Sequence, residues 1–210
     1  MSSVETILFD LGEVTLCGMM GVEKSIAPHV NAPEPDVWKH VNGKKLRRLF
    51  IGKSSEAEYW QQVIEEGRYP AEIGGIPAAD FLMHAMRSNF REIEGTADIV
   101  RSLKKAGYNV GLISDHVREW VEYCKTMFPL DELFNTQCYS FDCGCTKKAA
   151  GSFTYALKRV GAEPESTLFV DDNSRNLFVA QQHPVNIRYV HQFTNAENLR
   201  AALPSYGIQV

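Results

Sequence analysis

The sequence contains no run of about 18 apolar residues, the length that a membrane-spanning helix requires. Its first residues also lack the basic region of a secretory signal, and Asp10 and Glu13 interrupt the apolar stretch that follows. We therefore expect neither a signal peptide nor an association with a membrane.

An excess of basic charge is also lacking, because 22 Lys and Arg stand against 26 Asp and Glu, for a net charge of −4. Nucleic-acid binding usually needs a clustered basic surface, so no nucleic-acid partner is expected. The five cysteines are few and scattered, at Cys17, Cys124, Cys138, Cys143 and Cys145. Because they form no paired framework and too few lie together for a zinc site, we expect a reducing compartment, the cytoplasm.

What is present is the pattern of an α/β fold. Short apolar runs at residues 6–9, 110–113 and 167–170 read as buried strands, with weaker candidates at 137–140 and 187–190. Helical patterns at 96–106, 152–160 and 175–182 fall between them. This alternation predicts a doubly wound parallel sheet, in which ligands bind at the carboxyl ends of the strands.

Residues 17–91 interrupt the alternation and read as almost wholly helical. Helices are expected at 41–50, after the capping box Ser55 to Glu58, and at 78–90. The 210 residues are therefore expected to form a core of residues 1–16 and 92–210, with residues 17–91 inserted after the first strand.

Three of the predicted strands end in polar residues that suit one chemistry. Asp10 follows the first strand, Ser114 ends the second and the pair Asp171-Asp172 follows the third. Adjacent carboxylates favour a cation between them, and Mg²⁺ prefers such oxygen ligands. A hydroxyl and the ammonium of Lys147 would bind an anion. Acids for a metal beside donors for an anion indicate phosphoryl transfer.

The same residues resemble the four motifs of the haloacid dehalogenase-like (HAD) hydrolase superfamily. The matching segments, in family order, are Ile7-Leu8-Phe9-Asp10-Leu11-Gly12-Glu13-Val14, Gly111-Leu112-Ile113-Ser114-Asp115, Gly144-Cys145-Thr146-Lys147 and Leu168-Phe169-Val170-Asp171-Asp172-Asn173. The resemblance implies a Rossmann-like core and makes the helical insertion a small cap. The Asp-Leu-Gly form of the first motif is similar to that of sugar-phosphate phosphatases, such as glucose-1-phosphate phosphatases.

The resemblance also implies a role for each motif residue. Asp10 would attack phosphorus and form an aspartyl-phosphate. Asp10, the Gly12 carbonyl and Asp172 would hold Mg²⁺, with Asp171 bonded to metal-bound water. The phosphoryl oxygens would be held by Ser114 and by backbone N–H groups near Gly12 and Asp115, and Lys147 would neutralise charge. Lys148 competes with Lys147 for this last role. His116, beside Ser114, is expected to begin a helix at the surface.

The sequence departs from the family pattern in three places. Gly12 stands where most phosphatases of the superfamily have a second Asp as general acid, so either the leaving group departs without that acid or Glu13 or a cap residue donates the proton. Asp115 adds negative charge near the anion site, and Lys148-Ala149-Ala150 replaces a Pro-Asp-Pro sequence.

The leading interpretation is a Mg²⁺-dependent phosphatase of a small phosphorylated metabolite. One alternative is a haloacid dehalogenase, whose Tyr two residues after the nucleophile is missing here. The other is a catalytically degenerate binding protein. Neither the substrate nor the oligomeric state follows from the sequence.

Overall fold

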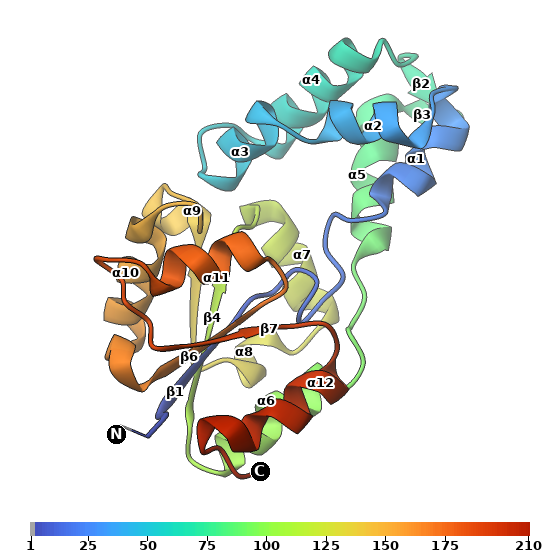
Figure 1. The fold of residues 1–210 in the computed structure, drawn as a ribbon. Coiled ribbons are helices and arrows are strands. Elements are labelled where there is room, and N and C mark those ends of the chain that lie inside the picture. The colour runs from blue at the N-terminus through green and yellow to red at the C-terminus, as the bar shows by residue number, and fades with distance from the viewer. Residues whose placement is uncertain (1–2) are drawn as a thin grey trace.

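The computed structural model describes residues 3–210 as a five-stranded parallel sheet with helices on both faces and a layer of further helices at one end (Figure 1). The strand order is β5-β4-β1-β6-β7, which confirms the predicted doubly wound fold. The strands are β1 (Thr6–Phe9), β4 (Asn109–Ser114), β5 (Thr136–Tyr139), β6 (Thr167–Asp171) and β7 (Tyr189–Gln192).

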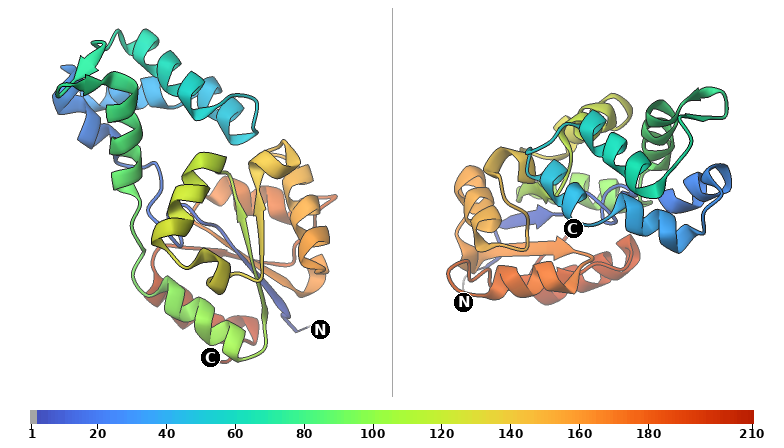
Figure 2. Two further views of the ribbon diagram at one scale, coloured as in Figure 1. Left: turned by 180° about the vertical axis from the view of Figure 1, so that it is seen from behind. Right: turned by 90° about the horizontal axis from the view of Figure 1, so that it is seen from above.

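Side chains that alternate along β1 bury both faces of the sheet. Ile7 and Phe9 belong to one apolar cluster and Leu8 to the other. Helices α6 (Thr96–Lys105), α7 (Arg118–Met127), α8 (Leu130–Leu133) and α12 (Ala196–Ala202) contribute to the first cluster, and α10 (Ala150–Val160) and α11 (Ser174–Gln181) to the second. Helices α6 and α12 lie side by side, as Figure 2 shows. Short helices α9 (Ser140–Cys143), η1 (Pro164–Ser166) and η2 (Leu203–Tyr206) complete the core.

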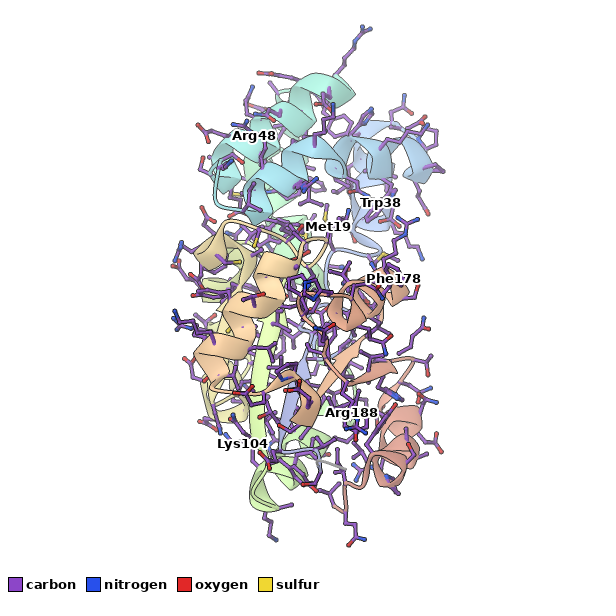
Figure 3. All side chains as sticks on the ribbon, turned by 60° about the vertical axis from the view of Figure 1, so that its left-hand side comes forward. Met19, Trp38, Arg48, Lys104, Phe178 and Arg188 are labelled. Atoms are coloured by element: carbon purple, nitrogen blue, oxygen red, sulfur yellow. The ribbon has the colours of Figure 1, made fainter. Side chains whose placement is uncertain are left out.

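The helical layer, here called the cap, spans residues 22–89 and is joined to the core by one segment after β1 and one before α6 (Figures 1 and 2). Its elements are α1 (Val22–Val30), α2 (Glu34–Val41), α3 (Lys44–Phe50), α4 (Glu56–Gly67), β2 (Glu72–Ile73), β3 (Ile76–Pro77) and α5 (Ala78–Asn89). Side chains of cap and core meet along the edge nearest α9 and α11 (Figure 3). Of the helices within residues 3–210, none is both long and apolar enough to cross a bilayer.

The cap is almost wholly helical, as predicted, and its exception is the antiparallel hairpin that β2 and β3 form around Gly74 and Gly75, both at positive φ. The helix expected at 41–50 begins later, at Lys44, because Val41 is the last residue of α2 and the non-helical Asn42 and Gly43 separate the two helices, with a φ of +102° at Gly43. The capping box at Ser55 is confirmed. The division of the chain at residues 17 and 91 stays a prediction.

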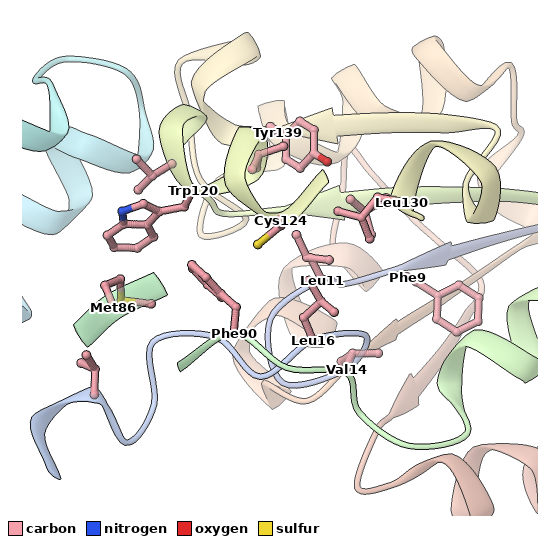
Figure 4. Packing of buried hydrophobic residues seen from close by; sticks show 14 of the residues in the cluster. Phe9, Leu11, Val14, Leu16, Met86, Phe90, Trp120, Cys124, Leu130 and Tyr139 are labelled. Atoms are coloured by element: carbon pink, nitrogen blue, oxygen red, sulfur yellow. The ribbon is translucent and has the colours of Figure 1, made fainter. Parts of the chain in front are cut away.

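Glu56 joins the cap to the core. Its buried carboxylate accepts hydrogen bonds from the indole N–H of Trp60 in the cap (3.1 Å) and of Trp120 in the core (2.8 Å). Arg87 of α5 pairs with both Glu56 oxygens, at 3.0 and 2.7 Å. Phe90 packs against Trp120, with the two ring centroids 6.2 Å apart (Figure 4). A charge-assisted network of this kind fixes geometry as well as adding stability, so it orients the cap over the strand ends.

Candidate active site

The register of the sheet brings the predicted acids together. Phe9 of β1 lies opposite Val170 of β6, and the Asp10 N–H donates to the Val170 carbonyl at 2.9 Å. Asp10 and Asp171 therefore lie beside one another, at the carboxyl ends of two neighbouring parallel strands. One carboxylate oxygen from each of Asp10, Asp171 and Asp172 lies within 4.8 Å of the others.

The ammonium of Lys147 lies between two of these acids. Its Nζ is 2.6 Å from Asp10 Oδ2 and 2.7 Å from Asp171 Oδ2, and the residue is 1% exposed. Burial alone would lower the pKa of Lys147, but the charges of Asp10, Asp171 and Asp115 raise it above its ordinary value. Lys147 is therefore a permanent cation at the base of the site.

One ammonium does not neutralise all the acids around it. Burial raises the pKa of Asp10 well above its ordinary value, although Lys147 opposes the shift. Burial and the charge of Asp171 likewise raise the pKa of Asp172. Carboxylates that are costly to ionise together are stabilised by a further cation, and these all-oxygen donors fit a hard ion such as Mg²⁺.

Two asparagines and a backbone amide orient these carboxylates. Asn176 Nδ2 lies 3.1 Å from both oxygens of Asp171, and the Asn173 N–H donates to Asp171 Oδ1 at 2.8 Å. The Leu11 N–H donates to Asp10 Oδ1 at 2.7 Å. Sequence analysis gave Asn173 only as part of the fourth motif and did not single out Asn176. The position of Asn176 in the first turn of α11, just after the paired acids, was the available signal, since a side chain there can turn back toward a strand end.

Above the acids lies a pocket of about 230 Å³. It is lined by Asp10, Gly12, Phe50, Asp115, Lys147, Lys148, Asp172, Asn173 and Asn176. Phe50, which sequence analysis did not single out, is the cap's contribution from α3. Asp115 accepts the Lys147 N–H at 2.9 Å and so holds the loop that carries the buried lysine.

Two predicted site residues have different surroundings. Ser114 is buried at the end of β4 and is not one of the pocket's lining residues, so its contact with phosphate stays a prediction. Lys148 is exposed at the rim, whereas Lys147 is buried between carboxylates. The geometry therefore favours Lys147 over Lys148 for the role beside Asp10.

Comparison with known proteins identifies the family. A family model described as haloacid dehalogenase-like hydrolase matches residues 4–183. The chain belongs to the haloacid dehalogenase-like hydrolases. It is 33% identical to the pyrophosphatase PpaX of Bacillus cereus strain G9842 over 178 residues, which are 85% of this chain and 79% of that relative. A match to PpaX of strain AH820, 33% identical over 90 residues, spans 43% of this chain and 42% of that relative.

Solved HAD structures share the fold. A HAD family enzyme from Bacteroides thetaiotaomicron, in complex with magnesium and inorganic phosphate, superposes with a TM-score of 0.74 at 19% identity, covering 92% of this chain and 96% of its own. The L-2-haloacid dehalogenase of Xanthobacter autotrophicus, with chloropropionic acid covalently bound, gives 0.64 at 15% identity over 99% and 85%. Since both have this fold, the fold alone does not separate phosphate chemistry from dehalogenation.

Gly12 leaves room for a side chain at the position where most phosphatases of the superfamily have an Asp. A Cβ built on Gly12 meets no heavy atom within 4 Å, and Gly12 is not one of the glycines with positive φ. The backbone there does not require glycine. Glu13, at a φ of +58°, accepts the Gly18 N–H at 2.8 Å through Oε1, and its charge contributes to raising the pKa of Asp172. A carboxylate is therefore near the site, but it is already hydrogen-bonded.

His116 corrects one expectation, because it is buried (5% exposed) rather than at the surface. Burial lowers its pKa from 6.5 to about 4, and its Nδ1 accepts the Val117 N–H at 3.0 Å. The unfolded chain takes up the proton near 6.5 and the folded chain only near 4. Above pH 6.5 His116 is neutral in both states and does not change the free energy of unfolding. As the pH falls from 6.5 toward 4, only the unfolded chain takes up the proton, so the folded protein loses stability.

We expect His116→Asn, which can still accept the Val117 N–H but does not titrate, to remove this acid sensitivity. The wild type should lose about 2 kcal/mol more than the variant between pH 7 and pH 5. Urea unfolding at both pH values measures the difference. Parallel losses in the two proteins would show that His116 is not the group responsible.

Proposed function

We propose that the protein is a Mg²⁺-dependent phosphatase that hydrolyses a small phosphorylated metabolite through an aspartyl-phosphate. The observation that carries this proposal is the Lys147 ammonium between Asp10 and Asp171, with Asp172 beside them at the base of a small pocket. A nucleophile, a fixed cation and a set of oxygen donors for a metal are the parts that phosphoryl transfer requires.

Asp10 is the nucleophile in this proposal. The Leu11 N–H and the Lys147 ammonium each hold one of its oxygens, so the carboxylate is oriented before substrate arrives. An Asp10 oxygen attacks phosphorus, and the bond from phosphorus to the leaving oxygen breaks. Water then hydrolyses the aspartyl-phosphate to release inorganic phosphate and regenerate Asp10. Lys147 stabilises the negative charge on the oxygens around phosphorus in the transition states of both steps.

Asp10, Asp171, Asp172 and the Gly12 carbonyl would hold the Mg²⁺. When bound, the ion neutralises phosphoryl oxygens and screens them from the acids. Ser114 and the backbone near Gly12 and Asp115 are the proposed phosphate contacts. We also propose a cytoplasmic location, from the cysteine pattern.

The relatives support phosphate chemistry over dehalogenation. The curated relatives that match most of the chain are named pyrophosphatases, which makes pyrophosphate one candidate among small phosphorylated compounds. The three acids also favour this function, because a metal-independent dehalogenase has no need of an acidic pair for a metal.

A panel of phosphorylated metabolites, pyrophosphate and a 2-haloacid, assayed with Mg²⁺ and with excess chelator, tests the function. We expect release of inorganic phosphate from at least one compound, dependent on Mg²⁺ and poorly supported by Ca²⁺, whose longer bonds disturb the geometry. Halide release that persists in chelator would establish the dehalogenase instead. No turnover of any compound by folded protein would favour the degenerate binding protein.

The missing acid at Gly12 predicts a strong dependence on the leaving group. General acid catalysis contributes about 10²–10⁴-fold, and without it the leaving oxygen must bear its own charge. We expect a sugar 1-phosphate to be preferred over the 6-phosphate, and rates on aryl phosphates to fall steeply as the phenol pKa rises. Gly12→Asp, for which there is space, should flatten that slope, whereas the control Gly12→Ala should not. A flat wild-type slope, with chemistry rate-limiting, would mean that Glu13 or a cap residue donates the proton.

A further inference from the structure

A second cavity adjoins the catalytic pocket on the core side. It has a volume of about 410 Å³ and is lined by Lys148, Ser174, Arg175, Phe178 and Val179. Lys148 also lines the pocket that contains Asp10, so the two cavities meet at this side chain. We call the second cavity the α11 subsite, because the other four residues belong to that helix. The shared Lys148 side chain places the α11 subsite next to the pocket that contains Asp10.

Phe178 gives the α11 subsite an aromatic surface. Helix α11 buries Leu177 and Ala180 against the sheet and turns Phe178 outward, where it is 64% exposed, the highest value among the exposed large hydrophobic residues of the described chain. Figure 3 shows it at the edge of the core that faces the cap. An isolated apolar side chain on a surface is ordinary, but one placed beside a catalytic pocket gains by covering part of a ligand.

The same subsite carries two cations without partners. Neither Lys148 nor Arg175 forms an ion pair within residues 3–210, whereas the neighbouring Lys147 is paired with two carboxylates. Lys148 is close enough to Asp115 to oppose the rise in the pKa of that acid, so its charge acts at the pocket rim. Arg175 presents a planar guanidinium that suits a carboxylate or a phosphate group.

We propose that the α11 subsite binds the leaving group of the substrate, and that this group contains an aromatic ring and a second negative charge. The inference rests on the proposed phosphatase function and specifies its substrate class. The ring packs on Phe178, and the second anion, a carboxylate or a further phosphate, is held by Lys148 and Arg175. The scissile phosphate remains at Asp10 and Lys147. Recognition by both surfaces selects against neutral aliphatic esters, which use neither.

Four probes assayed with Mg²⁺ separate these contributions. Acetyl phosphate measures the basal reaction and phenyl phosphate adds a ring. The matched pair 4-carboxyphenyl and 4-carbamoylphenyl phosphate differs in one negative charge at nearly constant shape. We expect kcat/KM for the carboxyl compound to exceed that for the amide by about tenfold, the effect of one charge-assisted contact. A fifth probe, hydroquinone bisphosphate, tests whether phosphate fits the second anion site better than a carboxylate does.

Variants identify the side chains responsible. Arg175→Gln should lower kcat/KM about tenfold for the probes that carry a second anion and leave the other probes unchanged. Phe178→Ala should lower it about fivefold for every ring-bearing probe and leave acetyl phosphate unchanged. Lys158→Gln and Met127→Ala, an exposed cation and an exposed apolar residue on other helices, are the controls and should change nothing.

A carboxyl-to-amide rate ratio that is the same in the wild type and in Arg175→Gln, or variants that change all probes alike, would overturn the subsite while leaving the phosphatase in place. Loss of self-association in Phe178→Ala, measured by light scattering and without a change in probe preference, would overturn it in favour of a protein interface. Failure of the folded wild type to hydrolyse any of these probes would overturn the proposed function, and the subsite with it.

Discussion

Replacing Asp10 by Asn is expected to reduce phosphatase turnover by about 10⁴–10⁶-fold, as removal of a covalent nucleophile does elsewhere. The amide keeps the shape of the carboxylate and can still accept the Leu11 N–H, but it has no anionic oxygen to attack phosphorus. Lys147 retains Asp171 as a partner, so the variant should remain folded. Steady-state release of inorganic phosphate measures turnover. Mass spectrometry of the quenched enzyme detects a covalent phosphoryl group.

The wild type should show the added phosphoryl group during turnover, and Asp10→Asn should not. Asp10→Ala, which cannot revert by deamidation, is the matched second variant. Near wild-type turnover in Asp10→Ala would eliminate Asp10 as the covalent nucleophile, because this variant has no side-chain oxygen that could attack phosphorus.

Replacing Lys147 by Gln is expected to lower both the turnover rate and the stability of the folded protein. We expect turnover to fall by about 10²–10³-fold, because a fixed positive charge is removed from the reacting centre. Asp10 and Asp171 would also lose the cation buried between them, and an unpaired buried charge is strongly destabilising. Saturating Mg²⁺ should therefore raise the melting temperature more in the variant than in the wild type.

Thermal unfolding with Mg²⁺ and with chelator tests this response, and Lys158→Gln is the control for loss of a surface lysine. An identical Mg²⁺ shift in wild type and Lys147→Gln would contradict the shared electrostatic role. A shift in the control as large as in Lys147→Gln would mean that net charge, rather than this position, is responsible.

The strand ends were predictable because two local signals coincide there. Apolar runs long enough for a buried strand stop at Asp10, at Ser114 and at Asp171, and parallel strands bring such ends to one edge. Sequence spacing and resemblance pointed to Lys147, and its burial between carboxylates agrees. Lys147 and the two acids it contacts all belong to the core, so this part of the site could be predicted without knowing how the cap folds.

Long-range contacts were not predictable in the same way. The sequence around Asp115 does not indicate that its carboxylate accepts the Lys147 N–H. The two residues are 32 positions apart, and their contact depends on how two loops meet. The last strand also begins later than its apolar run suggests. Ile187 and Arg188 donate their N–H groups to Ala180 and Pro164 instead of pairing with β6.

The carboxylate of Glu56 has a consequence for spectroscopy. Two of the three tryptophans of the chain, Trp60 and Trp120, donate to it from opposite sides of the junction, with ring centroids 6.4 Å apart. Indole emission responds to the charge and the solvent around the ring. The intrinsic fluorescence of the protein is therefore weighted toward the contact between cap and core, and an unlabelled sample carries its own optical reporter of any movement there.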